Sequence, residues 1–446
     1  MKILVTGSKG QLGNEIQVLS KRHPQHNYVF VDVDELDITN NTSVQQFFAQ
    51  HQFDVCINCA AYTAVDKEEG DDTMAALINV TGVEYLANAC QRAGAVLFHI
   101  STDFVFDGSA TSPIEVATSV NPISVYGQTK AEGEYRALSL NQKTILIRTS
   151  WVYSTFGNNF VKTMIRLGKE KPELGVVNDQ VGCPTYAKDL AWVIFEFIKK
   201  LPTIEYGIYH FSNSGVTSWC GFAQKIMELY GLNCKVNPIT TDQYPTPAKR
   251  PKYSVMNCDK TINTLQINIP HWENALEECI QLLKQQEMLE QIDVKKIIAI
   301  AEAAGKEIMQ IYDTDDFAVT DKSDNSPLTK ADKAGNAVIV AALKKQYPQI
   351  PIISEENKMI EYADRKDWNY FWLVDPLDGT KEFIKKNGEF TVNIALVRNG
   401  KPVLGVVGIP AKNQMYYAVE NKGAYKIDEN GVETKLVVNE PKTDEI

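Results

Sequence analysis

The sequence predicts an α/β fold in two parts, a doubly wound parallel sheet followed by a separate α+β module. Segments of helical periodicity, such as 79–93, alternate with short apolar strands at 2–6, 28–33, 54–60, 96–101 and 144–149. Strands and helices that alternate at this spacing form a parallel sheet covered by helices on both faces. All eight cysteines and all six histidines lie before residue 280, which marks a change of composition near that point.

Each element of the first part has a local cause. Residues 2–6 (Lys-Ile-Leu-Val-Thr) are a short apolar run, and the glycine turn that follows opens an amphipathic helix ending near residue 20. After residue 151 the alternation loosens into proline-rich segments such as 244–247 and 250–251. These segments predict a smaller substrate lobe over the carboxyl edge of the sheet, where ligands bind in open α/β folds. We therefore expect a Rossmann-type sheet with a substrate lobe from about residue 151 onward.

The boundary between the two parts lies in a helical region. Segments 271–286 and 292–312 both have the periodicity of amphipathic helices, and no Gly, Ser or Pro spacer separates them. We predict domains at 1–286 and 288–446. Met288 stands where a second protein could start, so the junction is either a natural fusion or two adjacent genes joined by a lost stop or a frameshift.

Composition excludes several classes of protein. A chain of 446 residues exceeds what one core usually holds, and 44% hydrophobic with 23% charged residues is typical of globular proteins. A net charge of -11 argues against binding to a nucleic acid polymer or an anionic membrane. The first apolar run is too short for a signal peptide, and no stretch approaches the length of a membrane span. We expect a cytoplasmic location.

A glycine-rich run at 7–13 (Gly-Ser-Lys-Gly-Gln-Leu-Gly) lies between the first strand and the first helix. In a dinucleotide-binding turn, Gly7 permits the turn, Gly10 lets the backbone approach a pyrophosphate, and Gly13 lets the helix pack on the strand. The positive end of the helix dipole then faces the phosphate charge. A lone glycine motif is weak evidence, but this one has the required context.

Asp32 ends the second strand, where it can accept hydrogen bonds from an adenosine ribose. A free 2′-hydroxyl suits this carboxylate better than a 2′-phosphate, whereas nearby Lys9 could offset the repulsion. The choice between NADH and NADPH therefore stays open.

Tyr126 and Lys130 are spaced so that both side chains lie on one face of a helix. The free phenol has a pKa near ~10, so we expect the Lys130 charge to lower the pKa of Tyr126 by ~2 to 3 units. Thr102, which ends the strand 96–101, is expected to hydrogen-bond the same reacting oxygen. Such a pair recurs by chance in surface helices, but its combination with the glycine turn predicts a reductase with Tyr126 as the acid.

Residues 1–286 resemble the dTDP-4-dehydrorhamnose reductase family of extended short-chain dehydrogenases/reductases. The matching runs are 60–67 (Ala-Ala-Tyr-Thr-Ala-Val-Asp-Lys), 101–106 (Ser-Thr-Asp-Phe-Val-Phe), 148–153 (Arg-Thr-Ser-Trp-Val-Tyr), 158–160, 178–185 and 244–251. The resemblance implies reduction of dTDP-4-dehydro-6-deoxy-L-mannose to dTDP-L-rhamnose by NADH or NADPH, the last step of dTDP-rhamnose biosynthesis.

The resemblance also implies roles for individual residues. Catalysis falls to Tyr126, Lys130 and Thr102. The cofactor contacts are Gly7, Gly10, Gln11, Leu12, Gly13, Asp32, Asp37, Ile38, Ala61, Tyr62, Thr63, Tyr126 and Lys130. The contacts to the dTDP-sugar are Thr102, Asp103, Trp151, Asn159 and Arg250.

Two other functions are compatible with a dinucleotide-binding first part. Related dehydratases carry an acidic residue directly after Thr-Asp, whereas this chain has Phe104, which disfavours dehydration. A nonenzymatic NAD(P)-binding regulatory subunit is the alternative, and the intact Tyr126 and Lys130 count against it.

The second part carries acidic motifs at 354–356 (Ser-Glu-Glu) and 375–380 (Asp-Pro-Leu-Asp-Gly-Thr) behind the apolar strand 371–374. With the run 324–329 (Asp-Asn-Ser-Pro-Leu-Thr) they resemble the inositol monophosphatase superfamily, most closely its 3′(2′),5′-bisphosphate nucleotidase branch. Carboxylates suit Mg²⁺, a cation that prefers oxygen ligands, and two such ions can activate water at a phosphoryl group.

The resemblance implies four metal ligands, two groups that orient water and two that hold phosphate. The ligands are Glu355, Asp375, the Leu377 carbonyl and Asp378, the water is held by Asp332 and Thr380, and phosphate by Gly379 and Thr380. Mg²⁺ could also serve the reductase part.

The family's later Trp-Asp segment and its base-reading segment are absent, so we expect a truncated module with strands near 391–398 and 402–408 and with weak or no phosphatase activity. An active Mg²⁺-dependent nucleotidase is the alternative. Apolar surface left exposed on such a half is expected to favour self-association, for instance as a homodimer.

Overall fold

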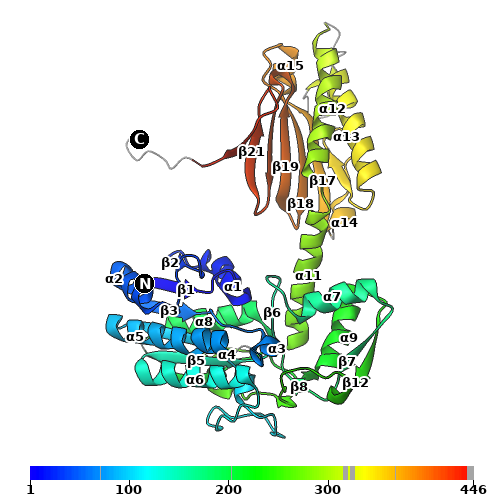
Figure 1. Ribbon diagram of the computed structural model, residues 1–446. Helices are drawn as coiled ribbons and strands as arrows, with labels where there is room; N and C mark the ends of the chain where they lie inside the picture. Colours follow the sequence, from blue (N-terminus) through cyan, green and yellow to red (C-terminus); the bar gives the residue numbers. More distant parts are fainter. Residues whose placement is uncertain (71, 202, 315–319, 322–326, 367, 439–446) are drawn as a thin grey trace. The chain divides into compact units, whose positions relative to one another are not determined.

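The computed structural model of the protein describes residues 1–70, 72–201, 203–314, 320–321, 327–366 and 368–438. The chain forms two compact units, Met1–Gln285 and Gln286–Ile446, and the boundary falls inside helix α11 (Trp272–Glu290). Figure 1 shows a layered α/β arrangement in the first unit and a broad sheet flanked by long helices in the second. No helix in the described ranges is long and apolar enough to cross a bilayer.

The first unit is built on a six-stranded parallel sheet, which confirms the predicted fold class. The strand order is β10-β5-β4-β3-β1-β2, and every neighbouring pair is parallel. The strands are β1 (Lys2–Thr6), β2 (Asn27–Phe30), β3 (Val55–Asn58), β4 (Val96–Thr102), β5 (Thr144–Thr149) and β10 (Gly207–His210). The strand order reverses between β1 and β3, and open α/β sheets bind their ligands at such a point.

Helices cover both faces of this sheet, because successive strand residues point to opposite sides. Ile3 and Val5 of β1 pack with Leu12 of α1 (Gln11–Ser20) and with α8 (Ala187–Lys200). Leu4, between them, packs on the other side with α2 (Asn41–His51), α5 (Val83–Ala93) and α6 (Val125–Leu140). Three short helical elements line the carboxyl edge: α3 (Val65–Glu68), α4 (Asp72–Ala76) and the π-helix η1 (Leu77–Gly82), followed after β4 by η2 (Asp103–Val105).

The region after residue 151 is not one continuous lobe, since α8 and β10 belong to the main sheet and its helical layer. The remainder has its own core, which includes Phe222 and Trp272. Its small sheets are β6-β9, β12-β7 and β11-β8-β13. The elements are β6 (Val152–Tyr153), α7 (Phe160–Glu170), β7 (Glu173–Val177), β8 (Val181–Gly182), β9 (Thr185–Tyr186), β11 (Thr217–Ser218), α9 (Trp219–Tyr230), β12 (Lys235–Ile239), η3 (Thr241–Gln243) and β13 (Tyr253–Ser254). Helix α10 (Asp259–Leu265) packs with the main sheet through Leu265.

The second unit is a seven-stranded sheet in the order β16-β17-β18-β19-β20-β21-β22, antiparallel except for the β16–β17 pair. The strands are β16 (Ile352–Ser354), β17 (Tyr370–Asp378), β18 (Thr391–Arg398), β19 (Lys401–Ile409), β20 (Gln414–Val419), β21 (Gly423–Ile427) and β22 (Glu433–Leu436). The other elements are α12 (Val294–Tyr312), α13 (Lys330–Gln346), α14 (Tyr362–Arg365), α15 (Thr380–Ile384), η4 (Pro410–Lys412) and the short pair β14 (Thr320–Asp321) and β15 (Pro327–Leu328).

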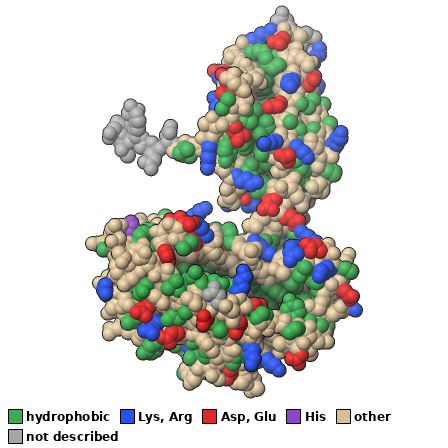
Figure 2. All heavy atoms as spheres, in the orientation of Figure 1, with side chains coloured by type: hydrophobic (Ala, Val, Ile, Leu, Met, Phe, Trp, Pro, Cys, Tyr) green, Lys and Arg blue, Asp and Glu red, His purple; other side chains and the backbone are tan. Residues whose placement is uncertain are grey.

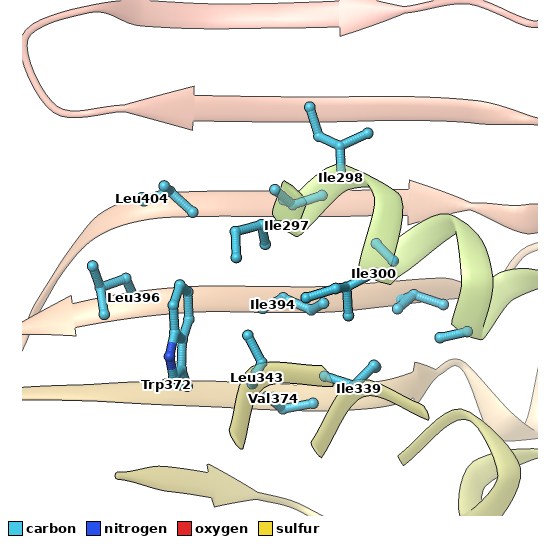
Figure 3. Close-up of a cluster of buried hydrophobic side chains, with 14 of the residues drawn as sticks. Ile297, Ile298, Ile300, Ile339, Leu343, Trp372, Val374, Ile394, Leu396 and Leu404 are labelled. Atoms are coloured by element: carbon cyan, nitrogen blue, oxygen red, sulfur yellow. The ribbon is translucent and has the colours of Figure 1, made fainter. Parts of the chain in front are cut away.

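Helices α12 and α13 cover one face of this sheet. Figure 3 shows Ile297 and Ile300 of α12 and Leu343 of α13 pointing at Trp372 and Ile394 of the central strands. On these strands the buried positions alternate with more exposed ones, as expected of a sheet with one covered face. Leu373 and Val407 are apolar residues on β17 and β19 that are 47% and 38% exposed.

Candidate active site

The glycine turn between β1 and α1 has no room for a side chain at Gly7 or Gly13. Gly7 has a φ of +61°, and a Cβ on it would lie 2.6 Å from the Ala60 nitrogen. A Cβ on Gly13 would lie 2.4 Å from the Gly7 oxygen. Gly10 caps α1, and its N–H donates to the Gly7 carbonyl at 3.1 Å. The turn therefore brings bare backbone and a helix N-terminus to the carboxyl edge of the sheet.

Two adjoining cavities open at this turn, of about 700 Å³ and about 630 Å³. Gly10, Cys59, Ala60 and Ala61 line both cavities. From the predicted site, the first cavity is lined by Gly7, Gly10, Asp32, Asp37, Ile38 and Ala61. The second, from here the reaction cavity, is lined by Gly10, Gln11, Leu12, Ala61, Thr63, Thr102, Asp103, Tyr126, Lys130, Trp151, Asn159 and Arg250.

Two residues predicted to contact a cofactor line neither cavity. Gly13 packs against the backbone of the turn, which is a structural role. Tyr62 is held through its backbone, whose N–H donates to Asn79 Oδ1 at 2.9 Å and whose carbonyl accepts from Asn79 Nδ2 at 3.1 Å. The Tyr62 side chain lines neither cavity, so its predicted contact with the cofactor stays a prediction.

The first cavity has an acidic end. Asp32 accepts hydrogen bonds from the backbone N–H groups of Lys9 and Val33, both at 2.9 Å. The Lys9 ammonium is paired with Asp34 at 2.9 Å and lies 3.7 Å from Glu35. Lys9 was expected to offset the repulsion between Asp32 and a 2′-phosphate. In the structure its ammonium instead pairs with the carboxylates of Asp34 and Glu35.

Tyr126 and Lys130 both face the reaction cavity from the first turns of α6. The Ser124 side chain caps this helix by accepting from the Gly127 N–H at 3.2 Å. Tyr126 is 9% and Lys130 2% exposed, and the Lys130 ammonium donates to the Ile100 carbonyl at 2.7 Å. Burial lowers the pKa of Lys130 to about 8, against the opposing effect of Glu134 and Glu68.

The predicted lowering of the tyrosine pKa by Lys130 is wrong for this structure. Burial raises the pKa of Tyr126, Thr102 lowers it, and Asp103 and Glu68 raise it further. The physical reason is that desolvation of a phenolate outweighs the neighbouring dipoles. The ammonium that was expected to favour the phenolate donates instead to a backbone carbonyl.

Thr102 and Asp103 stand where β4 ends. The Thr102 hydroxyl donates to Asp103 Oδ1 at 3.0 Å and accepts from the Phe104 N–H at 3.2 Å. Asp103 is 2% exposed, and burial raises its pKa to about 6, although hydrogen bonds from Ser254 and Thr102 oppose this. The hydroxyl is thus fixed beside the Tyr126 phenol.

Trp151, which also lines the reaction cavity, adopts a left-handed backbone conformation with φ of +50°. Its ring stacks on Trp219 with centroids 3.7 Å apart and an interplanar angle of 12°. The Phe160 ring packs at a tilt against the same Trp219 ring, with the two centroids 4.6 Å apart. Strained backbone of this kind gathers at functional sites. Sequence reasoning missed Phe160, which follows Trp151 closely in the chain, and Trp219, which is far from it.

Two side-chain hydrogen-bond contacts join segments after residue 151 to helices α1 and α3 at the carboxyl edge of the sheet. Asn159 caps α7, and its Nδ2 donates to Gln11 Oε1 at 3.0 Å. The Arg250 guanidinium donates to both Asp66 oxygens, at 2.8 and 3.1 Å. A third cavity of about 610 Å³ shares Phe160, Trp219 and Arg250 with the reaction cavity.

In the second unit the structure brings together part of the predicted phosphate site. Thr380 Oγ1 donates at 3.3 Å to Asp332 Oδ1 or to the Leu377 carbonyl, at the start of α15. Gly379 has a φ of +95°, which glycine adopts without strain. Asp378 accepts from Asn393 Nδ2 at 3.2 Å. The predicted run 324–326 lies outside the described residues.

The carboxylates of the second unit repel one another. Burial, then the charges of Glu355 and Asp378, raise the pKa of Asp375 to about 7, and a hydrogen bond with Glu355 adds to the effect. In the described ranges, however, no group of three or more His, Cys, Asp or Glu side chains is arranged so that it could hold a metal ion. The oxygen atoms of Glu355, Asp375 and Asp378 have the chemistry that Mg²⁺ prefers.

Comparison with known proteins places both units. Residues 1–285 match the model of a family described as RmlD substrate binding domain, and residues 288–446 match that of the inositol monophosphatase family. A curated dTDP-4-dehydrorhamnose reductase from Aggregatibacter actinomycetemcomitans is 41% identical over 288 residues, which are 62% of this chain and 97% of the relative. A crystal structure of such a reductase from Clostridium acetobutylicum matches with a TM-score of 0.61 and 47% identity, covering 64% of this chain and 100% of that one.

A second solved structure, a dTDP-4-dehydrorhamnose reductase from Bacillus anthracis in complex with NADP, matches with a TM-score of 0.60 and 40% identity. The match covers 62% of this chain and 98% of that one. These relatives are covered almost completely by the first unit, and the family model spans that unit from end to end. The chain therefore belongs, through residues 1–285, to the dTDP-4-dehydrorhamnose reductase family.

Proposed function

We propose that the first unit reduces dTDP-4-dehydro-6-deoxy-L-mannose to dTDP-L-rhamnose with NADPH or NADH, as the last step of dTDP-rhamnose biosynthesis. One observation carries the proposal: Tyr126, Lys130 and Thr102 line the same cavity as the glycine-turn residues Gly10 and Gln11. A proton donor and a dinucleotide turn that share one cavity are what a carbonyl reductase requires.

The residues present fit a dinucleotide. Side chains at Gly7 and Gly13 would collide with backbone, so the turn offers a cradle that only glycine leaves open. Asp37 and Ile38 would flank the adenosine, and Ala61 and Thr63 the middle of the cofactor. When bound, the nicotinamide supplies the hydride that reduces C4 of the keto sugar.

Tyr126 gives the proton that completes the alcohol. Its raised pKa keeps the phenol protonated at neutral pH, so the donor is in its acid form when the substrate binds. The carbonyl oxygen becomes a strong base only as C4 accepts the hydride and the π electrons move onto the oxygen. The oxygen then takes the phenolic proton. Thr102 orients the same oxygen, and the Lys130 charge stabilises the phenolate that remains.

The substrate's nucleotide is proposed to occupy the third cavity. Phe160 and Trp219 form an apolar wall between this cavity and the reaction cavity, and Arg250 faces both. A guanidinium in this position suits the diphosphate that joins base and sugar. The sugar would lie against Trp151, with Asp103 and Asn159 at its hydroxyls.

The direct test is NADPH oxidation, followed at 340 nm, by the purified full chain with the dTDP keto sugar. Turnover that depends on both substrates supports the proposal. A chain that binds NADPH but does not oxidise it would instead be the nonenzymatic regulatory subunit.

For the second unit we propose weak or no phosphatase activity. The described part of the chain supports this proposal, because no group of three or more His, Cys, Asp or Glu side chains in it is arranged so that it could hold a metal ion. Hydrolysis of 3′-phosphoadenosine 5′-phosphate by the full chain, measured with and without Mg²⁺, tests it. Robust Mg²⁺-dependent release of phosphate would establish a second activity.

A further inference from the structure

The loop between β6 and α7, residues 154–159, is hydrogen-bonded to helix α1 at both of its ends. The Ser154 hydroxyl donates to Glu15 Oε1 at 2.6 Å, and Asn159 Nδ2 donates to Gln11 Oε1 at 3.0 Å. Gln11 is the first residue of α1, directly after the glycine turn, and Glu15 lies one turn further on. The 154–159 loop is therefore joined to the helix whose N-terminus is proposed to meet the cofactor.

The two contacts differ in their surroundings. Ser154 is 0% and Glu15 5% exposed, and neither side chain lines the reaction cavity. Gln11 and Asn159 are half-buried, and both line it. The Ser154–Glu15 bond is thus a buried anchor, whereas the Gln11–Asn159 bond joins two residues of the cavity lining.

The backbone of the 154–159 loop also approaches the Gln11 side chain closely. Gly157 has a φ of +62°, and a Cβ on it would lie 3.0 Å from Gln11 Cγ. The Lys162 ammonium holds the same glycine by donating to its carbonyl at 3.0 Å. Because Gln11 is packed by the loop as well as bonded to it, a displacement of the first turn of α1 also displaces the loop.

The Asn159 amide joins the loop to α7. Its Oδ1 accepts from the Lys162 N–H at 3.1 Å, which caps α7, and its Nδ2 donates to the Ser154 carbonyl at 2.7 Å. Its N–H groups are thus engaged by Gln11 and Ser154, while Oδ1 keeps a lone pair for a sugar hydroxyl. Phe160, the next residue, begins α7 and lines the reaction cavity. A shift of Asn159 therefore moves both a proposed sugar contact and part of the cavity wall.

We infer that Gln11 is a positioning residue that couples the two ligands, so that each binds more tightly when the other is present. The inference rests on the proposed function, which puts the dinucleotide at the glycine turn and the sugar beside Asn159. A pyrophosphate at the N-terminus of α1 fixes the first turn and, through the Gln11–Asn159 bond, the 154–159 loop. The sugar nucleotide then meets a loop that is already ordered. By linkage, the same factor applies in both directions.

The test measures binding of dTDP-L-rhamnose to the full chain by isothermal titration calorimetry, without NADPH and with saturating NADPH. This product and the reduced cofactor cannot react with each other, so the ternary complex persists. The ratio of the two Kd values is the coupling factor. Gln11→Met has a side chain of similar length without an amide oxygen, and we expect it to lower this factor about fivefold, as for one hydrogen bond between neutral groups.

Two further variants and a control separate the bond from other effects. Gln11→Glu keeps an acceptor for Asn159 Nδ2 and should keep the coupling factor, although its charge weakens NADPH binding itself. Asn159→Ser keeps a helix cap but does not reach Gln11, so it should lower the factor as Gln11→Met does, and the double variant should lower it no further. Gln17→Met is the matched control, because the Gln17 amide, on the same helix, donates to the Ser8 carbonyl at 2.8 Å.

An unchanged coupling factor in Gln11→Met overturns the inference, even if both ligands bind more weakly, since that result shows a purely structural role. A wild type whose Kd for dTDP-L-rhamnose is the same with and without NADPH overturns it too. Failure of both Gln11→Met and Asn159→Ser to fold would show that the contact is structural, with the same consequence. A wild type that binds and couples both ligands but does not oxidise NADPH with the keto sugar supports the coupling and contradicts the proposed reduction.

Discussion

Arg250 and Asp66, 184 residues apart in the sequence, form a two-point ion pair with N–O distances of 2.8 and 3.1 Å. Arg250 also donates to the Ala248 carbonyl at 3.1 Å, and the Ala248 N–H donates to Asp66 at 3.3 Å. The pair therefore fastens the proline-rich loop 244–251 to α3, next to the reaction cavity. It also holds the guanidinium between the reaction cavity and the third cavity.

Replacing Asp66 by Asn should weaken binding of the dTDP-sugar more than binding of the cofactor. The Asn side chain cannot hold the guanidinium by charge, so Arg250 and its loop lose their fixed position. We expect KM for the sugar nucleotide to rise about fivefold, the ratio that corresponds to ~1 kcal/mol. Steady-state kinetics check this, with Asp242→Asn, an exposed acid in the same region, as the control. An equal rise in both KM values would contradict a role for this pair in substrate binding.

Replacing Asp32 by Ala should shift cofactor preference toward NADPH. Asp32, Asp34 and Glu35 place three carboxylates around one Lys9, which opposes a 2′-phosphate. We expect the ratio of kcat/KM for NADPH over NADH to rise about tenfold, equivalent to ~1.4 kcal/mol of relieved repulsion. The ratio is measured with each cofactor in turn at saturating sugar nucleotide. An unchanged ratio would show that the adenosine ribose lies away from Asp32.

Replacing Trp219 by Ala should loosen the wall of the sugar site. Trp151 would lose the ring on which it stacks, and its strained backbone conformation would lose that support. Because an aromatic pair contributes ~0.5 to 1.5 kcal/mol beyond its buried area, KM for the sugar nucleotide should rise roughly three- to tenfold. Trp219→Phe retains a ring and should recover most of the loss. Equal KM values for the sugar nucleotide in Trp219→Ala and Trp219→Phe would mean that the stacking of Trp151 on Trp219 does not shape the site.

In the second unit, Thr329→Ala should lower stability through the start of α13. The Thr329 N–H and hydroxyl donate to Asp332 at 2.7 and 2.6 Å, and Thr329 Oγ1 accepts from the Ala331 N–H at 3.1 Å, which is a capping box. Loss of such a cap costs about 1 kcal/mol of unfolding free energy. Chemical denaturation of the full chain measures it, with the exposed Lys333→Ala as the control. Equal stability of both variants would show that Asp332 holds the helix start unaided.

The parts of the site that follow from local spacing were predictable from the sequence. Gly7 and Gly10 owe their positions to a turn between consecutive elements, and Tyr126 and Lys130 share one helix, so short-range geometry brings each set together. The strands near 391–398 and 402–408 were predictable for the same reason, since their apolar patterns are continuous.

The other parts of the site depend on contacts between segments that are distant in the sequence. Trp219 reaches the reaction cavity only through the packing of the lobe, and no local pattern distinguishes it from core residues. Arg250 is predicted only through the family resemblance of the run 244–251. The direction of the Tyr126 pKa shift was wrong for a related reason: burial, its largest cause, is a property of the folded chain.

Turnover by Tyr126→Phe tests the account most directly. The variant keeps the ring and loses only the hydroxyl that gives the proton. We expect kcat for NADPH oxidation with the keto sugar to fall by roughly 10² to 10⁴, while NADPH binding measured by fluorescence stays within a factor of two or so. Wild-type turnover by this variant would contradict the assignment of Tyr126 as the proton donor and, with it, the reductase mechanism.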